Sequence, residues 1–326
     1  MGIRITGTGS FTPEKIVTND DLAKLVDTND EWIRSRTGIR ERRIADAQTT
    51  ASDMAAEASI NALENAGITA DEIDLIIIGT ATPDKAFPST ACITQGKIDA
   101  INATCFDVSA ACSGLVYAIE IAESMLLAKG KYKKALVIGS EKFSHLVNWK
   151  DRNTCVLFGD GAGAVVLEQS DCDSGIIASK LGSNGKLGDI LQVKAGGTAH
   201  PLTKENYDKN DQFVSMEGQD VFKQAVQSMV SSCKEVMEEA GITSDQIKWL
   251  IPHQANYRIL KAVASRLKIQ EENVFMNLDK YGNTSAASIG IAMDEMNRSN
   301  SVSKGEYVLI TAFGGGLTWG ATLIRW

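Results

Sequence analysis

The 326-residue chain lacks the residue patterns that mark several protein classes. Its six cysteines form no C-x-x-C pair and its three histidines form no H-E-x-x-H motif, so we expect no metal site and no disulfide framework. No apolar run approaches the length of a membrane span, and the chain does not open with a basic region followed by an apolar stretch. We therefore expect a reduced, cytoplasmic protein without a membrane segment.

Basic residues are outnumbered, 33 against 41 acidic ones, and the formal net charge is −8. This balance argues against wholesale binding of nucleic acid. A cluster of arginines nevertheless follows Trp32. Such runs are usually solvated faces, but an aromatic ring beside arginines also suits a base with its phosphates. The cluster consists of Arg34, Arg36, Arg40, Arg42 and Arg43.

The sequence contains an internal repeat. Ala66–Ile76 matches Ala240–Leu250 at an offset of 240 − 66 = 174, and each copy follows an amphipathic helix and leads into a buried strand. Two later pairs also match: Leu136–Gly139 with Val308–Thr311, and Gly163–Glu168 with Gly320–Arg325. Strands that alternate with long helices predict a mixed or parallel sheet covered by helices. We therefore expect two α/β halves, residues 1–172 and 173–326.

Cys112 is the strongest candidate for a reactive side chain. It lies in Ala110–Gly114, where an apolar strand over Phe106–Val108 gives way to an amphipathic helix. The N–H groups and the dipole of a helix start favour a thiolate, so the position predicts a nucleophile with a lowered pKa. The alternative is a small buried apolar residue, because free cysteine is often buried.

The repeat supplies two partners for Cys112. The counterpart of Cys112 in the second half is position 284 (112 + 172), which lies next to Asn283. One strand of the first half ends at Gly79, and its counterpart ends at position 253 (79 + 174), which is His253. Ligands gather at such strand ends and helix starts in α/β sheets, so we expect the three side chains in one crevice. Taken alone, a histidine is more often structural than functional, and an asparagine can simply cap a helix.

Two glycine-rich segments have different interpretations. Gly159–Ala164 loosely imitates a dinucleotide-binding fingerprint, but a strand follows it instead of a helix, so we reject that site. Gly314–Gly316 follows a strand over Tyr307–Phe313 and is either a tight turn or the source of a backbone N–H that completes an oxyanion hole with the N–H of Cys112.

The order Cys112, His253, Asn283 also occurs in papain-like proteases, and the spacing of 253 − 112 = 141 residues fits that class. The local C-G-[SA]-C-[WY] signature is absent, and a duplicated α/β frame is not that fold. A hydrolase therefore stays as the weaker alternative.

With these residues in hand, the whole chain resembles the thiolase-superfamily condensing enzymes, most closely the β-ketoacyl-[acyl-carrier-protein] synthase III family. The segments that carry the resemblance are Asn29–Arg40, the turn at Cys112, Pro252–Asn256, Gly282–Ala287 and Ala312–Gly320. The resemblance implies a duplicated α-β-α-β-α layered fold, with the cysteine in the first half and the histidine and asparagine in the second.

The resemblance also implies a reaction, a decarboxylative Claisen condensation of a short acyl-CoA with malonyl-[acyl-carrier protein] that initiates type II fatty-acid synthesis. Cys112 would take the acyl group, with the N–H groups of Cys112 and Gly315 holding the oxyanion. His253 and Asn283 would then hydrogen-bond the malonyl thioester oxygen as CO₂ leaves, while Phe313 shields the site. No cofactor is implied beyond the CoA thioester substrate.

Further contacts follow from the same resemblance. Trp32 and Arg152 correspond to a pair that sandwiches the CoA adenine, and Asn256 to a contact with the pantetheine arm. The remaining implied contacts are Thr28 and Arg36 beside the adenine, Lys223, Arg258 and Lys261 for the acidic carrier protein, and Phe87 donated across a homodimer to cap the acyl pocket.

Two features depart from the best-known members of the family. Gln219 stands in place of an asparagine, and the segment Val193–Phe213 is longer, so the roof of the substrate tunnel should differ. Relatives that make quinolones, olefin precursors or polyketide starters share the Cys/His/Asn set, and an acyl-binding or thiol-sensing protein without catalysis is a further alternative. The sequence leaves the starter acyl group open.

Overall fold

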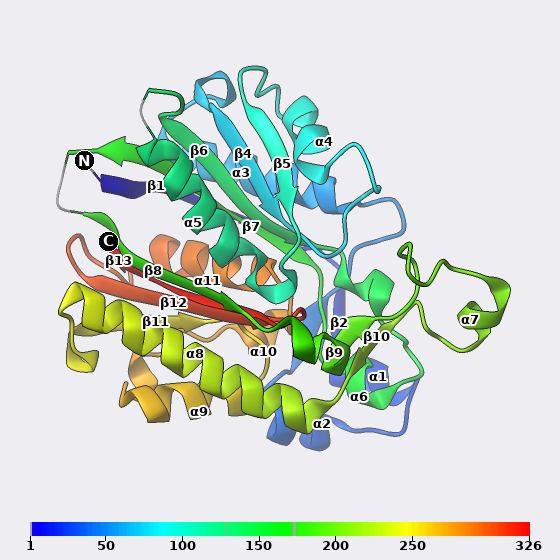
Figure 1. Ribbon diagram of the computed structural model, residues 1–326. Helices are drawn as coiled ribbons and strands as arrows, with labels where there is room; N and C mark the ends of the chain where they lie inside the picture. The colour runs from blue at the N-terminus through cyan, green and yellow to red at the C-terminus, as the bar shows by residue number, and fades with distance from the viewer. Residues whose placement is uncertain (1, 129, 172–173) are drawn as a thin grey trace.

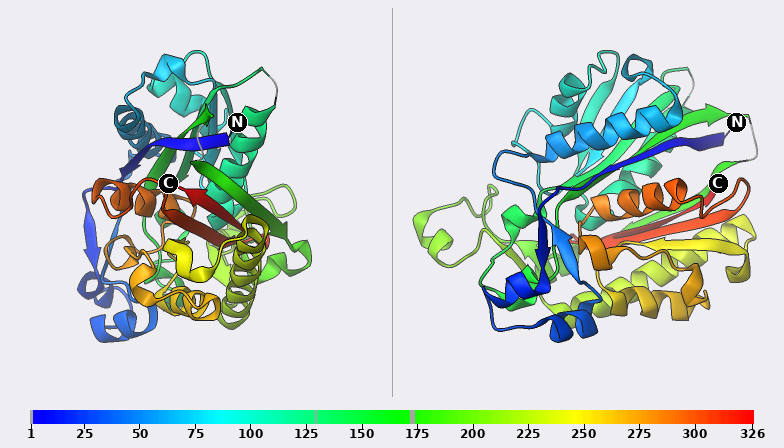
Figure 2. Two further views of the ribbon diagram at one scale, coloured as in Figure 1. Left: turned by 90° about the vertical axis from the view of Figure 1, so that its left-hand side faces the viewer. Right: turned by 180° about the vertical axis from the view of Figure 1, so that it is seen from behind.

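The chain folds into five layers, helix–sheet–helix–sheet–helix (Figure 1). The computed structural model describes residues 2–128, 130–171 and 174–326. Helices α5 (Gly114–Leu127) and α11 (Ala287–Arg298) form the central layer between the two sheets, as Figure 2 also shows from the side. Outside the sheets lie α3 (Ala51–Ala66) and α4 (Thr90–Lys97) on one face and α8 (Gly218–Ala240) and α9 (Tyr257–Leu267) on the other. The predicted layered α/β fold is confirmed.

The first sheet has the order β1-β7-β6-β4-β5. Its central strand pairs, β4 with β5 and β4 with β6, are parallel, and β7 runs antiparallel to both β6 and β1. The strands are β1 (Gly2–Phe11), β4 (Leu75–Gly79), β5 (Thr104–Val108), β6 (Lys134–Glu141) and β7 (Gly161–Ser170). The segment around Gly159 therefore leads into a strand, which agrees with the rejection of a dinucleotide fingerprint there.

The second sheet has the order β11-β12-β13-β8 and repeats the pattern without a counterpart of β5. β11 and β12 are parallel, and β13 is antiparallel to β12 and β8. The strands are β8 (Gly175–Ser183), β11 (Ile247–Pro252), β12 (Tyr307–Gly314) and β13 (Thr318–Arg325). The expected boundary between the halves, at residues 172 and 173, lies outside the described residues.

The repeated Ala-Gly-Ile-Thr sequence ends a helix in each half. Gly67 after α3 and Gly241 after α8 are both left-handed, with φ of 68° and 67°. In each half the N–H of the residue after the glycine donates to a backbone carbonyl of the preceding helix, that of Leu63 in the first half and that of Met237 in the second. Only glycine adopts this conformation without strain, so it fixes the turn from helix to buried strand. The same local signal therefore sets the direction of β4 and β11.

Apolar side chains fill the spaces between the layers. Buried residues of β4, β6 and β7 face α3 on one side, where small alanines such as Ala55 and Ala62 allow close packing. On the other side the sheet packs against α5 and α11, and α8 covers the second sheet. Both central helices start at the same end of the molecule. The first turn of each helix therefore lies beside strand ends of the other half.

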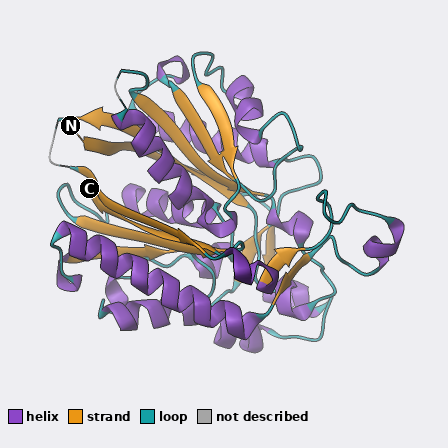
Figure 3. Ribbon diagram, in the orientation of Figure 1, coloured by secondary structure: helices purple, strands orange, loops and turns teal. Residues whose placement is uncertain are grey.

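Short elements surround that end of the sheets (Figure 3). A hairpin of β9 (Leu191–Val193) and β10 (Val214–Met216) carries an arm with α7 (Lys204–Asp208) that projects away from the layers in Figure 1. The other short elements are β2 (Ile16–Thr18), β3 (Glu41–Arg43), α1 (Asn19–Ala23), α2 (Asp30–Thr37), α6 (Arg152–Cys155), α10 (Leu278–Tyr281), and the 3₁₀ turns Ala70–Glu72, Ala111–Ser113, Phe143–Leu146, Gly185–Ile190, Ser244–Gln246 and Glu271–Asn273.

Candidate active site

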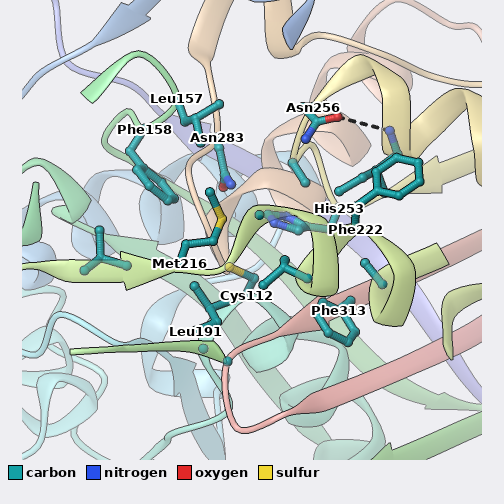
Figure 4. Close-up of a pocket in the computed structure, with 18 of the residues that line it drawn as sticks. Cys112, Leu157, Phe158, Leu191, Met216, Phe222, His253, Asn256, Asn283 and Phe313 are labelled. Atoms are coloured by element: carbon teal, nitrogen blue, oxygen red, sulfur yellow. Dashed lines mark hydrogen bonds between the residues drawn. The ribbon is translucent and has the colours of Figure 1, made fainter. Parts of the chain in front are cut away.

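A pocket of about 1110 Å³ opens where the central helices begin. Cys112, His253 and Asn283 all line it, and in Figure 4 the sulfur, the imidazole and the amide converge on one space. All three side chains are buried. The pocket therefore brings together the three residues that the repeat placed at equivalent strand ends and helix starts.

Cys112 is held by a strained turn between β5 and α5. Ala111, just before it, is left-handed with φ of 46°, an unfavourable conformation for a residue with a Cβ. Thr318 donates a hydrogen bond of 2.8 Å to the carbonyl of Ala110, and the Ser113 hydroxyl donates one of 3.1 Å to the carbonyl of Thr318. A Cβ on Gly314 would lie 2.7 Å from the backbone nitrogen of Cys112, so only glycine permits this approach. The second half thus fixes the turn of the first.

The expectation of a lowered thiol pKa at Cys112 is wrong. Burial is the main cause that raises the pKa of the Cys112 thiol to about 12; the neighbouring Ser285 hydroxyl opposes this rise, and the nearby Glu141 carboxyl contributes to it. The physical reason is that the helix start lies in an apolar pocket, where loss of hydration disfavours the thiolate. The cysteine therefore needs a group that takes its proton.

His253 follows directly from the end of β11. Its backbone N–H donates to the carbonyl of Thr311 over 2.7 Å, and its Nδ1 lies 2.8 Å from the Ser288 hydroxyl on α11. That hydroxyl accepts the N–H of Gln254, so it can donate its own proton to Nδ1, which leaves the ring proton on Nε2. Burial lowers the pKa of His253 to about 4, so the ring is neutral near pH 7.

Asn283 is not a helix cap, because the N-cap of α11 is Ala286. Its backbone N–H donates to the carbonyl of Leu157 over 2.8 Å, and its own carbonyl accepts from Gly159 over 3.0 Å. The side-chain oxygen accepts the Ser285 N–H over 2.9 Å. The amide is thereby oriented with its NH₂ group free to donate within the pocket.

Gly315 and Phe313 also line the pocket, at the turn between β12 and β13. Phe313 is 4% exposed and lies beside Cys112 in Figure 4. Backbone N–H groups at Cys112 and Gly315 therefore border the space around the sulfur, where an oxyanion formed on a thioester carbonyl would need donors.

The predicted adenine site has a closed arrangement. The guanidinium carbons of Arg36 and Arg152 lie 4.7 and 4.8 Å from the centre of the Trp32 ring. A flat ring in contact with both Trp32 and Arg152 needs about 7 Å between them, so Arg152 has to move for a base to enter. Arg36 lines the pocket, and the buried Thr28 hydroxyl has no hydrogen-bond partner in the described part of the chain.

The residues expected to meet the pantetheine arm and the carrier protein lie on α8 and α9. Asn256 caps α9 by accepting the Ile259 N–H over 3.1 Å (Figure 4). It lines the pocket, and so does the exposed Arg258. Lys223 and Lys261 are exposed but do not line it. Of the three residues predicted to meet the carrier protein, Arg258 lines the pocket, and the two lysines lie exposed on α8 and α9.

Two other expectations concern the edge of the site. Phe87 is 85% exposed and does not line the pocket of its own chain. Gln219 does line it, together with Leu191, Val193 and Met216 of the β9–β10 hairpin. Of the segment Val193–Phe213 itself only Val193 lines the pocket, so this side of the pocket is built by the β9 and β10 strands and by the start of α8.

Sequence reasoning missed two polar groups at the site, Glu141 and Ser288, and it misread Arg42. Glu141 is a single acidic residue at the end of the apolar strand β6, and that contrast is the signal that marks it. Arg42 is fully buried and donates to Val17, Asn19 and Val156, so it holds loops together and is not available to a phosphate.

No group of three or more His, Cys, Asp or Glu side chains in residues 2–128, 130–171 and 174–326 is placed to hold a metal ion. Over the same residues, no helix is both long and apolar enough to cross a membrane.

Two parts of the chain match one protein family. Residues 106–185 match the family described as 3-oxoacyl-[acyl-carrier-protein] synthase III, and residues 237–326 match its C-terminal part. A β-ketoacyl-[acyl-carrier-protein] synthase III of Caldanaerobacter subterraneus is 52% identical over 322 residues, which cover 99% of this chain and 97% of the relative.

Solved structures agree with this match. The 3-oxoacyl-[acyl-carrier-protein] synthase III of Aquifex aeolicus is 48% identical with a TM-score of 0.93, and the alignment covers 100% of both chains. A priming β-ketosynthase from the R1128 polyketide biosynthetic pathway is 34% identical with a TM-score of 0.91, covering 99% of this chain and 96% of the other.

Proposed function

The chain belongs to the β-ketoacyl-[acyl-carrier-protein] synthase III family and is an acyltransferase, and we propose that Cys112, His253 and Asn283 carry out its reaction. That reaction condenses an acyl-CoA with malonyl-[acyl-carrier protein] in fatty-acid synthesis. The observation that carries the assignment of residues is the convergence of the three buried side chains in one largely apolar pocket.

Acylation comes first. Cys112 Sγ bonds to the carbonyl carbon of the acyl-CoA, and the bond from that carbon to the CoA sulfur breaks. The N–H groups of Cys112 and Gly315 stabilise the negative charge that develops on the carbonyl oxygen. Cys112 loses its thiol proton in this step and the leaving CoA thiolate takes one up, so acylation consumes no net proton.

Condensation follows when malonyl-[acyl-carrier protein] enters. The Nε2–H of neutral His253 and the NH₂ of Asn283 donate to its thioester oxygen, which stabilises the enolate as CO₂ leaves. The enolate carbon bonds to the acyl carbon on Cys112, the bond from that carbon to Cys112 Sγ breaks, and the released thiolate takes one proton from solvent. Phe313 keeps water from the enolate. Neither donor carries a negative charge, which would repel the developing enolate.

Binding of the substrates involves the rest of the predicted set. Trp32, Arg36 and Arg152 receive the CoA adenine after Arg152 swings aside, and Thr28 and Asn256 contact the nucleotide and the pantetheine arm. The exposed Lys223, Arg258 and Lys261 attract the acidic carrier protein. We further propose that the enzyme acts in the cytoplasm as a homodimer, with Phe87 of each chain capping its neighbour's pocket, and that it needs no cofactor beyond the thioester.

Replacing His253 or Asn283 with alanine tests the division of labour. Acylation of Cys112 by acyl-CoA, followed by intact mass, should continue at a similar rate. Release of CO₂ from malonyl-[acyl-carrier protein] should fall about 10²-fold or more for each lost donor. Equal loss of both steps in either variant would contradict the roles assigned here.

A further inference from the structure

Glu141 is a fully buried carboxyl that the steps above leave without a task. It ends β6 and lies against the start of α11, where the packing is so close that a Cβ on Gly139 would clash with the carbonyl oxygen of Ala286. Burying a carboxyl is costly unless its oxygens are hydrogen-bonded. The groups that it bonds therefore show what this carboxyl does.

Donors from both halves of the chain converge on the carboxyl. Its Oε2 accepts the Thr82 hydroxyl over 2.6 Å, and its Oε1 accepts the Ala81 N–H and the Ser285 hydroxyl, each over 3.0 Å. Ala81 and Thr82 follow β4 in the first half, whereas Ser285 precedes α11 in the second. An ionised carboxyl accepts at both oxygens and donates at neither, so it satisfies all of these donors at once. It thereby ties Ser285 to the first half.

Ser285 passes this constraint to Asn283. Its backbone N–H donates to the side-chain oxygen of Asn283 over 2.9 Å, which turns the NH₂ group of that amide towards the pocket. The backbone of Ser285 is left-handed with φ of 50°, a conformation that a residue with a Cβ keeps only where the surrounding structure fixes it. The bond from its hydroxyl to Glu141 supplies such a constraint.

Backbone hydrogen bonds hold the two ends of this turn but not the amide. The Asn283 N–H donates to the carbonyl of Leu157, the Asn283 carbonyl accepts from Gly159, and the Ser288 N–H donates to the carbonyl of Ser285 over 3.2 Å. These bonds fix the backbone at position 283 and the first turn of α11. The orientation of the Asn283 amide depends instead on where the Ser285 N–H points, and the bond to the buried carboxyl sets the position of that residue.

We propose that Glu141 is a positioning residue for the condensation step, which through Ser285 holds the Asn283 amide where its NH₂ group meets the malonyl thioester oxygen. It touches neither substrate and takes no proton. A displacement of about 1 Å can cost about 10²-fold in rate, so a loosened amide should slow the release of CO₂. Acylation of Cys112 does not use this amide and should not depend on Glu141. The proposal rests on the proposed function of Asn283.

Glu141→Gln tests the proposal, because it keeps the size of the side chain and replaces one acceptor oxygen with a donor NH₂ group. Burial raises the pKa of Glu141 to about 7, so the assays are run at about pH 8.5, where the carboxyl is ionised. Acylation by acyl-CoA, followed by intact mass, should stay within about 2-fold of wild type, whereas kcat for release of CO₂ from malonyl-[acyl-carrier protein] should fall about 10-fold at an unchanged KM. Release of CO₂ within about 2-fold of wild type, or an equal fall in both steps, overturns the proposal.

A double variant shows whether Glu141 acts through Asn283. Glu141→Gln combined with Asn283→Ala should release CO₂ no more slowly than Asn283→Ala alone, because no amide is left to position. A further loss of about 10-fold in the double variant would show that the carboxyl acts on the site by another route, and would overturn the proposal. If Asn283→Ala itself releases CO₂ at the wild-type rate, the proposed function of Asn283 fails, and this proposal fails with it.

Two further variants complete the test. Ser285→Ala removes the link and leaves the carboxyl in place, so it should show the same selective loss; a wild-type rate of CO₂ release there overturns the proposal, and this variant decides if Glu141→Gln fails to fold. Asp294→Asn is the matched control, since this buried carboxyl lies about two turns into α11 and accepts the hydroxyls of Thr8 and Ser10. Both steps should keep their wild-type rates in the control, and a selective loss of CO₂ release there would also overturn the proposal.

Discussion

Burial of His253 should make the protein less stable in mild acid. The pKa of this imidazole is lowered from 6.5 to about 4 by burial, so the unfolded chain binds the proton more readily than the folded one. The stability present above pH 6.5 is lost as the pH falls towards the folded-state pKa. The full effect is about (6.5 − 4) × 1.36, or roughly 3 kcal/mol, of which about 2 kcal/mol is lost between pH 7 and pH 5.

Urea unfolding of the wild type and of His253→Gln measures this loss. Glutamine does not titrate, so the stability difference between the two proteins should shift by about 2 kcal/mol in favour of the variant from pH 7 to pH 5. His145→Gln, at an exposed histidine, is the control and should show no such shift. Parallel changes in the wild type and His253→Gln would refute the view that His253 is buried as a neutral ring.

Three other substitutions test the remaining contacts. Arg42→Met should lower the free energy of unfolding by about 3 kcal/mol, measured in urea, because each buried acceptor left without a donor costs about 1–3 kcal/mol; a loss below about 1 kcal/mol would contradict the structural role. Trp32→Ala should raise KM for acyl-CoA about 10-fold with little change in kcat, and an unchanged KM would place the adenine elsewhere. Lys223→Glu should raise KM for malonyl-[acyl-carrier protein] at low salt, with the effect fading as salt is added. An unchanged KM at low salt would show that α8 is not part of the docking surface.

The architecture could be predicted from the sequence because its signals are local and occur twice. The Gly67 and Gly241 turns each combine a left-handed helix end with a following strand, and their matching positions imply the duplication. The positions of Cys112, His253 and Asn283 followed from that symmetry, since equivalent strand ends and helix starts meet at one edge. The family motifs agree with this placement.

Electrostatic properties were harder to predict because they depend on burial. Cys112 lies at a helix start, as expected, but the apolar surroundings reverse the expected direction of its pKa shift. Arg42 belongs to an arginine-rich run, and nothing in that run distinguishes the one guanidinium that is buried against carbonyls. Glu141 and Ser285 come together from segments 144 residues apart. The stacking of Arg152 on Trp32 likewise depends on side-chain packing.

The central claim is that Cys112 carries the acyl group before condensation. The most direct test is the intact mass of the protein after incubation with a panel of acyl-CoAs, beside Cys112→Ala. The wild type should gain the mass of one acyl group, the variant should gain none, and malonyl-[acyl-carrier protein] should discharge the adduct as a β-ketoacyl product. An adduct that persists in Cys112→Ala, or one that malonyl-[acyl-carrier protein] does not discharge, would contradict this account.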